Sequence, residues 1–265
     1  MTRTSIASVN WPAAPRPCPP RSPRPAALPS TTLSKLRKLL RFEPLGDAAA
    51  YAGFSAALDI EVNEALQAVA VVLRRHAPPW VRDVVPALGG IALHFDPEHP
   101  DLPAAPLAAA EALVRESIGA VPFRAQRGKL IEVPVCYDPE FALDIVEVAG
   151  ISGSAPEDIA DRHCATEHHV LMVGFSPGQP YLGGLDPKLA IPRRATPRTR
   201  VPAGSVAIAN AQTAVYPFET PGGWSVIGRT PLVLFDPARD PPSLFAPGDR
   251  VRFVAVSRTE FARLK

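Results

Sequence analysis

The stretch VPAGSVAIANAQTAVYPFETPGGWSVIGRTPLVLF, residues 201–235, consists of short apolar runs separated by Pro, Gly and Asn. Such runs at even spacing are typical of strands in a barrel or sandwich. The pattern extends outward to VLMVGF at 170–175 and DRVRFVAVS at 249–257. We therefore predict a mainly-β domain over residues 127–265, with one short helix near Pro156–His163.

A helical periodicity replaces this pattern in the first half of the chain. Val62, Leu66 and Val69 recur at spacings of three and four, which gives a helix one apolar face, and Asp59 can cap its start. We expect helices over 59–75 and 107–118, and strands over 39–46, 47–54, 89–96 and 130–137. This order, β-β-α-β-α-β, predicts a loosely ferredoxin-like α+β domain over residues 35–126 with its helices on one face.

Residues 1–34 are rich in Pro and Arg and offer no packed apolar face, which predicts a disordered tail. Residues 1–41 contain eight Lys or Arg and no acid, and the remaining chain has 20 bases against 26 acids. The net charge of +2 therefore combines a basic tail with an acidic body. A transit peptide or a nucleic-acid-binding arm has a similar charge, but the prolines would interrupt an amphipathic helix.

The cysteines and the hydropathy of the chain indicate its compartment. Cys18, Cys136 and Cys164 are odd in number and lack C-x-x-C spacing, so they predict neither a disulfide framework nor a thiolate zinc site. No apolar run approaches the roughly 18 residues needed to span a bilayer. We expect a cytoplasmic protein with reduced thiols and with no membrane or nucleic-acid partner.

The string GFSPG, residues 174–178, matches the G-x-S-x-G pattern of α/β-hydrolases. The residue after the nucleophile must donate its backbone N–H to the oxyanion, and here that residue is Pro177, which has none. All six histidines also precede Ser176, so the hydrolase order Ser, acid, His is not available. These features argue against a serine hydrolase.

Three histidines lie close together in the sequence, at positions 163, 168 and 169. No helical register brings His163 and His168 together, and no Cys or acid pair completes a tetrahedral set. The neighbouring pair of His163 and Cys164 is not a thiolate pair either, because adjacent side chains on one element do not face each other. We predict no metal site.

The chain also lacks both common phosphate-binding motifs, the P-loop and G-x-G-x-x-G. The segment IPRRATPRTRVPAGS at 191–205 offers guanidinium groups for bidentate contacts on a loop stiffened by Pro. A solvated basic loop is the alternative. The glycine-rich loop GFSPGQPYLGGL at 174–185 predicts strained turns with free backbone N–H groups, and Trp224 in TPGGW predicts either a pocket wall or a core residue.

Several of these segments, in the same order, resemble one family. They are IEVPVCYDPEFALDIVEVA, HCATEHHVLMVGFSPGQPYLGGL, PRRATPRTRVPAGSVAIA, QTAVYPFETPGGWSVIGRTPLVLFDP and APGDRVRF, which together cover nearly all of residues 130–255. The chain resembles the allophanate hydrolase subunit 1 family, which includes the B subunit of bacterial 5-oxoprolinase and the KipI-type kinase inhibitors. The resemblance is weaker over residues 42–96.

The resemblance implies an α+β N-terminal domain followed by a cyclophilin-like β-barrel. It also implies two partners, a homologous C-type subunit (allophanate hydrolase subunit 2-like) and a LamB/YcsF-like A subunit. The reaction that it implies is the ATP-dependent opening of 5-oxo-L-proline to L-glutamate, with ATP bound by this chain or by a partner. The resemblance also suggests roles for residues that lie on the family motifs. The candidates for binding phosphate or carboxylate are Arg193, Arg198 and Arg229, and the candidates for orienting the amide are His163, Gln212 and Tyr216. Further candidate binding residues are Gly178, Ser205 and Trp224.

Two other functions stay open at this level. A KipI-like chain would bind a sensor histidine kinase and have no turnover of its own. A carboxyltransferase-like chain would resemble the matching domain of urea carboxylase, which accepts carboxyl from biotin. Because this sequence has no biotin-carrier or biotin-carboxylase segment, it would need those in trans. No metal or biotin site is evident in the sequence.

Overall fold

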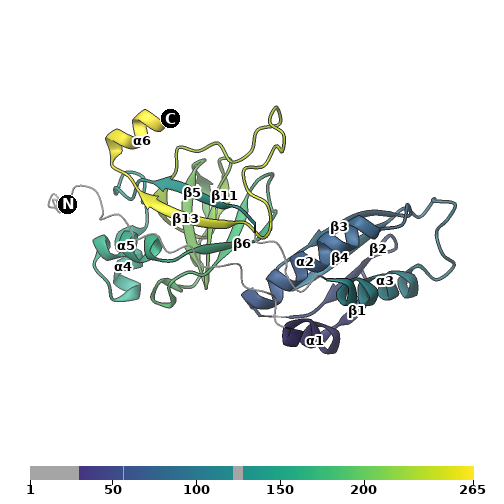
Figure 1. The fold of residues 1–265 in the computed structure, drawn as a ribbon. Helices are drawn as coiled ribbons and strands as arrows, with labels where there is room; N and C mark the ends of the chain where they lie inside the picture. The colour runs from purple at the N-terminus through teal and green to yellow at the C-terminus, as the bar shows by residue number, and fades with distance from the viewer. Residues whose placement is uncertain (1–29, 56, 122–127) are drawn as a thin grey trace.

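The computed structural model describes residues 30–55, 57–121 and 128–265, and it forms two domains (Figure 1). The first domain is a four-stranded antiparallel sheet in the order β1-β2-β4-β3, with helices packed on one face. Its elements are α1 (Ser30–Leu39), β1 (Arg41–Pro44), β2 (Ala49–Gly53), α2 (Ile60–His76), β3 (Val81–Pro86), β4 (Gly90–Phe95) and α3 (Pro106–Ala120).

Helix α2 forms for the reasons that the sequence suggests. The Asp59 carboxylate accepts a hydrogen bond from the Val62 backbone N–H at 3.1 Å, which satisfies one of the free donors at the start of the helix. Val62, Leu66 and Val69 are buried against the sheet. The predicted apolar face is therefore the face that packs.

Two elements of this domain were not predicted. Strand β3 lies at the edge of the sheet and carries exposed Arg82 and Asp83, so its apolar alternation is short, and its Pro86 is tolerated because an edge strand needs fewer ladder bonds. With α1, the order is therefore α-β-β-α-β-β-α rather than β-β-α-β-α-β, and the strand predicted over 130–137 belongs to the sheet of the second domain. Helix α1 includes residues 30–34 of the predicted tail, because its Leu36 is fully buried in the core. The rest of the predicted tail, residues 1–29, and the predicted domain boundary at 126 lie outside the described residues.

The second domain is a seven-stranded sheet in the order β12-β9-β10-β7-β6-β13-β5 that nearly closes into a barrel. Its two edges meet where Cys136 N–H donates to Arg229 O at 2.8 Å and Arg229 N–H donates to Cys136 O at 3.0 Å. The strands are β5 (Leu130–Val135), β6 (His168–Val173), β7 (Pro180–Gly183), β9 (Ser205–Ala209), β10 (Gln212–Val215), β12 (Ser225–Arg229) and β13 (Arg250–Ala255). A separate hairpin pairs β8 (Arg198–Val201) with β11 (Thr220–Gly222), and the helices are α4 (Ile145–Ser152), α5 (Pro156–Ala165), the short η1 (Pro187–Leu189) and α6 (Arg258–Leu264).

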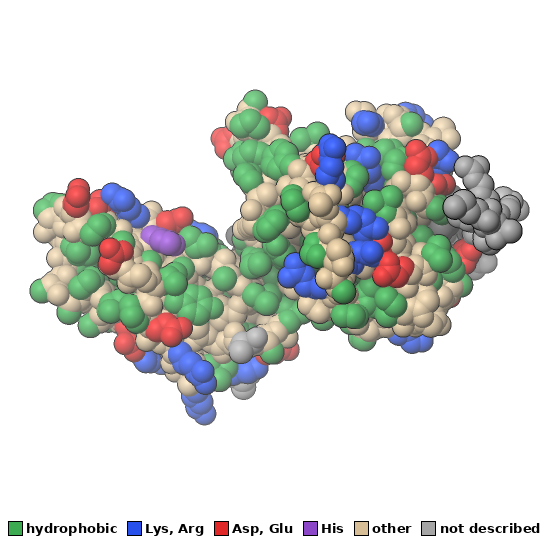
Figure 2. All heavy atoms as spheres, turned by 180° about the vertical axis from the view of Figure 1, so that it is seen from behind, with side chains coloured by type: hydrophobic (Ala, Val, Ile, Leu, Met, Phe, Trp, Pro, Cys, Tyr) green, Lys and Arg blue, Asp and Glu red, His purple; other side chains and the backbone are tan. Residues whose placement is uncertain are grey.

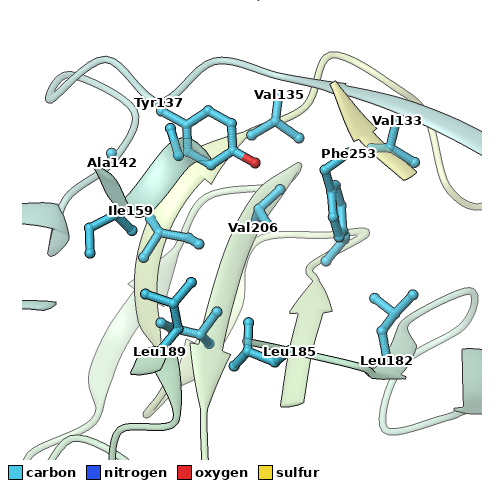
Figure 3. Packing of buried hydrophobic residues seen from close by; sticks show 14 of the residues in the cluster. Val133, Val135, Tyr137, Ala142, Ile159, Leu182, Leu185, Leu189, Val206 and Phe253 are labelled. Carbon is cyan, nitrogen blue, oxygen red and sulfur yellow. The ribbon is translucent and has the colours of Figure 1, made fainter. Parts of the chain in front are cut away.

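The barrel interior is filled by side chains from its strands, among them Val133, Leu182, Val206 and Phe253 (Figure 3). Strand β9 is buried on both faces. Its even-numbered residues point into this core, whereas Ala207 and Ala209 belong to a smaller outer cluster with Tyr216 and Trp224. That outer cluster positions the candidate site.

Several predictions for the second domain need correction. The glycine-rich loop contains strand β7, and helix α4 was not predicted because its eight residues are too few to show a clear helical periodicity. The apolar run at residues 230–235, which was expected to be part of a strand, forms none; within it, Phe235 makes an isolated β-bridge to Ser243. The helix near Pro156–His163 is confirmed, and the names ferredoxin-like and cyclophilin-like stay predictions. None of the described helices combines the length and apolar character of a membrane span.

Candidate functional site

An aromatic cluster lies on the outer face of the barrel. Tyr181 comes from β7, Tyr216 follows β10, and Trp224 precedes β12. The Tyr181 and Trp224 rings meet edge to face, with centroids 5.6 Å apart. Alternation along the strands explains the placement, because Leu182 points into the barrel core while its neighbour Tyr181 points outward.

Glycine in the TPGGW turn allows the backbone to approach Tyr216 closely. A Cβ at Gly222 would lie 2.5 Å from the Tyr216 hydroxyl oxygen, a distance that no side chain tolerates. The turn therefore fixes the phenol from one side, and Trp224 is buried beside it with 8% of its surface exposed.

Both phenols keep their protons at neutral pH. Burial raises the pKa of Tyr216 to about 12; the nearby Tyr181 adds to this shift, and Arg193 opposes it. Burial also raises the pKa of Tyr181, again against Arg193. Both hydroxyl groups are therefore neutral; that of Tyr181 is partly buried, whereas Tyr216 is 3% exposed and lies inside the cluster.

Arg193 supplies the positive charge of the cluster. It is exposed, it acts electrostatically on both tyrosines, and its Nη2 lies 3.8 Å from the position of a Cβ at Gly223. Within the described ranges Arg193 forms no ion pair. A guanidinium beside two neutral phenols is suited to bind a small carboxylate or phosphate.

The neighbouring arginines are already neutralised. The buried Asp144 carboxylate accepts from Arg198 Nη1 and Nη2 at 2.7 and 2.6 Å, and from Arg194 Nη1 at 2.8 Å. Arg194 Nη1 also donates to Glu147 at 2.5 Å, and this bond is the main reason that the pKa of Arg194 is raised. Two cations thus face two anions, and Arg198 is not free to bind a ligand. Figure 2 shows basic side chains with acidic ones among them over the barrel domain.

The loop before β7 reaches the cluster through Gln179, which is 3% exposed. Ser176 Oγ donates to Gln179 Oε1 at 3.2 Å, and Gln179 Nε2 donates to the Tyr181 hydroxyl at 3.4 Å. Gly178 has a φ of +77° and Phe175 a φ of +72°, so the expected strained turn is present here. Ser176 donates to an amide rather than to a histidine, in agreement with the argument against a hydrolase.

His163 lies elsewhere, inside the barrel, and is fully buried. Its Nδ1 lies 2.7 Å from the Tyr137 hydroxyl, its Nε2 lies 3.0 Å from Thr213 Oγ1, and its ring stacks on Phe253 at 4.3 Å. Burial is the main cause of its lowered pKa, and His168 adds to the shift. His163 therefore does not share a face with Arg193, and we assign it to the core.

The expectation that His163 and His168 stay apart was wrong, because their ring centroids are 5.0 Å apart. Helix α5 ends at Ala165 and the chain turns at once into β6, so the two rings meet across a helix–strand junction that helical spacing does not describe. No cluster of three or more metal-ligating side chains exists among the residues that the structure describes.

The other predicted residues lie around the cluster rather than in it. Gln212 shares the outer face of β10 with Tyr216 by alternation, and its Nε2 is buried without a hydrogen-bond partner. Arg229 donates through Nε to Ala203 O at 2.8 Å near the barrel seam, and Ser205, paired with it, is 1% exposed. Gly178 is a turn residue packed against Phe235.

Of the nine candidates, the structure thus brings together Arg193, Tyr216 and Trp224, with Arg198 nearby but paired. Sequence reasoning missed Tyr181 and Asp144. Alternation in QPYLGG could have indicated Tyr181, and the position of Asp144 directly before an apolar helix could have indicated a buried acid.

The family of this chain follows from comparison with known proteins. Residues 40–245 match the family described as "Carboxyltransferase domain, subdomain C and D". The B subunit of 5-oxoprolinase from Bacillus subtilis (strain 168) is 38% identical over 232 residues, which are 85% of this chain and 96% of that protein. The chain belongs to the carboxyltransferase-domain family that includes this protein. The resemblance seen in the sequence is confirmed.

Further relatives and solved structures match this chain over different shares of their own length. The B subunit of 5-oxoprolinase from Escherichia coli O157:H7 is 52% identical over 126 residues, which are 48% of this chain and 58% of that protein. The crystal structure of TTHA0988 superposes with a TM-score of 0.68 at 36% identity over 79% of this chain, and the match spans only 40% of that longer chain. The urea amidolyase of K. lactis shares the fold, with a TM-score of 0.67 at 19% identity. The match covers 84% of this chain and 15% of that chain.

Proposed function

We propose that this chain is the B subunit of an ATP-dependent 5-oxoprolinase, which opens 5-oxo-L-proline to L-glutamate. The observation that carries the proposal is the 38% identity to the B subunit of a 5-oxoprolinase over 96% of that protein's length. The assembly would include a homologous C-type subunit and a LamB/YcsF-like A subunit, with ATP bound here or on a partner. Cys136 and Cys164 form no disulfide within the described residues, which fits work in the reducing cytoplasm.

The outer aromatic cluster is our candidate for substrate binding. 5-Oxoproline carries a carboxylate at neutral pH, and Arg193 offers a guanidinium with no ion-pair partner among the described residues. Tyr181 and Tyr216 are neutral phenols at neutral pH, and burial raises their pKa values further, so the partly buried Tyr181 can donate a hydrogen bond to the same anion and the buried Tyr216 adds no competing negative charge. Arg193 would then hold the substrate in a fixed orientation.

The reaction itself is electrostatically demanding. Phosphorylation of the lactam oxygen by ATP makes the ring carbon electrophilic, so that water adds to it and the ring C–N bond breaks, with the nitrogen leaving as the amine. A second water then hydrolyses the resulting acyl phosphate to the glutamate carboxylate and inorganic phosphate. Negative charge develops during the phosphoryl transfer and needs nearby positive charge. In this proposal Arg193 neutralises the substrate's own carboxylate, and other subunits supply what this chain lacks.

The test is to affinity-purify this chain from its own host, identify the proteins that co-purify, and assay the eluate for ATP-dependent release of glutamate from 5-oxoproline. Glutamate that forms with the C-type and A-type subunits present, and is lost without them, is the expected result. A sensor histidine kinase in the eluate with no glutamate would overturn the proposal in favour of a KipI-like inhibitor.

A further inference from the structure

Asp144 holds the arginine-bearing segment in place without belonging to the ligand-binding face. Its carboxylate is 2% exposed and accepts from Arg194, from both terminal nitrogens of Arg198, and from the Val226 backbone N–H at 2.7 Å. Its own N–H donates to Val226 O at 2.9 Å. One buried acid therefore joins the start of α4, strand β12 and residues 193–198.

The segment that Asp144 fixes carries Arg193. Arg194 lies directly after Arg193 and Arg198 ends the segment, and the backbone N–H of Arg194 donates to Gly223 O at 2.9 Å, next to the turn that packs on Tyr216. Residues 193, 195, 196 and 197 are exposed and belong to no strand or helix. The side-chain pairs to Asp144 thus replace the regular hydrogen bonds that would otherwise hold such a segment.

The charge balance around Asp144 explains why it does not itself attract a ligand. Arg194 and Arg198 carry two positive charges, and Asp144 and Glu147 carry two negative charges. Arg193, directly next to this neutral group, forms no ion pair in the described part of the chain. The network therefore separates arginines that hold the segment from one arginine that is free to bind.

We propose that Asp144 is a positioning residue that sets Arg193 over Tyr181 and Tyr216 by clamping Arg194 and Arg198, and so determines the affinity for a carboxylate-bearing substrate. The ligand part of this inference rests on the proposed function, whereas the clamp is a property of this chain alone. An arginine held in the ligand-bound orientation binds more tightly because it loses less freedom on binding.

The first experiment compares Asp144→Asn with the wild type in the purified complex. We expect the KM for 5-oxoproline to rise at least tenfold while kcat changes less than threefold, because binding to a fixed carboxylate is lost equally from substrate and transition state. Glu167→Gln is the matched control, since it removes a part-buried ion pair to Arg250 elsewhere on the barrel. An unchanged KM in folded Asp144→Asn would overturn the proposal.

The second experiment needs no partner protein and uses trypsin on the full chain. Release of the clamp lets the segment unfold locally around the bonds after Arg193 and Arg194, so Asp144→Asn should be cut at these two bonds at least tenfold faster than wild type, as followed by mass spectrometry. Arg198→Gln, which keeps the Asp144–Arg194 pair, should show an intermediate increase and serves if Asp144→Asn does not fold. Unchanged cleavage in both variants would overturn the clamp.

The two experiments separate the two proposals. A wild-type complex that forms no glutamate would remove the proposed function, and the cleavage rates would still decide the clamp. Faster cleavage with an unchanged KM would show that the segment is held for the fold alone and would overturn the positioning role.

Discussion

Arg193 is distinguished from its neighbours by what it does not contact. Arg194 and Arg198 are paired with Asp144, and Arg200 pairs with Glu219, whereas Arg193 forms no ion pair within the described residues. Four arginines in one segment therefore have different roles that their spacing in the sequence does not reveal. The free one lies beside two tyrosines whose pKa values are raised.

Arg193→Gln tests this distinction. Loss of a charge-assisted hydrogen bond costs about 1.5–3 kcal/mol, so KM for 5-oxoproline should rise roughly 10- to 100-fold. The melting temperature should stay within about 1 °C because the side chain is exposed and makes no ion pair in the described part of the chain. Steady-state kinetics and calorimetry measure the two quantities. Arg200→Gln, on the same segment, is the control, and an equal KM rise in that variant would show that only the general charge matters.

Gly222 tests the close packing around Tyr216. Gly222→Ala places a methyl group 2.5 Å from the phenol oxygen, so the turn or the ring must shift, at a cost of about 1–3 kcal/mol in the free energy of unfolding. Gly150→Ala is the matched control because that helical glycine has nothing within 4 Å, and alanine should be neutral or stabilising there. Urea denaturation compares them. Equal stability of the two variants would contradict the packing argument.

At the scale of elements, the junction between α5 and β6 buries His163 and His168 together. Burial lowers both pKa values, that of His168 to about 4. An unfolded histidine binds a proton near pH 6.5, while the native one stays neutral. The free energy of unfolding should therefore fall as pH falls from about 6.5 toward 4, by about 1.4 kcal/mol per pH unit for each histidine.

Replacing one of these histidines checks that slope. His168→Gln cannot titrate, so the fall in its free energy of unfolding between about pH 7 and pH 5 should be smaller than that of the wild type. Urea denaturation at a series of pH values gives the difference, which cancels the carboxylates common to both proteins. His94→Gln, at an exposed position of β4, should keep the wild-type slope. A wild-type slope in His168→Gln would contradict the assignment.

Element type was predictable wherever one periodicity dominated. Helix α2 and strands β9 and β10 have clear apolar patterns, and the structure has them. Strand β7 escapes prediction because its Pro and Gly residues mask the alternation, and β3 because an edge strand buries few residues. The periodicity of apolar residues indicates which face of an element is buried, so an element that buries few side chains has only a weak periodicity in the sequence.

The candidate site was less predictable than the fold, because it depends on contacts across long sequence separations. Asp144 and Arg198 are 54 residues apart, and Tyr137 and His163 are 26 apart. Residue chemistry suggested Arg193 and Tyr216 but placed His163 beside them, and only the three-dimensional structure shows that His163 points into the barrel. Charge pairing, which decides which arginine is free, is likewise visible only in three dimensions.

At the scale of the whole molecule, the two domains meet where the first half of α2 contacts β6 (Figure 1). A bulge between Val170 and Met172 leaves the Leu171 carbonyl free of the strand ladder, and Asn63 and Gln67 donate to it at 3.2 and 2.9 Å. Asn63 is 2% exposed and also donates to Ala87 O and Leu88 O of its own domain, so only removal of both amides leaves the Leu171 carbonyl without these donors.

Asn63→Leu with Gln67→Ala should therefore weaken the coupling between the domains. Differential scanning calorimetry should show the unfolding of the full chain broaden or split into two transitions, with a loss of about 1–3 kcal/mol per stranded carbonyl. Glu61→Gln, an exposed change on the same helix, should leave the profile unchanged. If the double variant unfolded like wild type, the α2–β6 contact would be a passive one, and the first domain would be free to reorient relative to the barrel that carries Arg193.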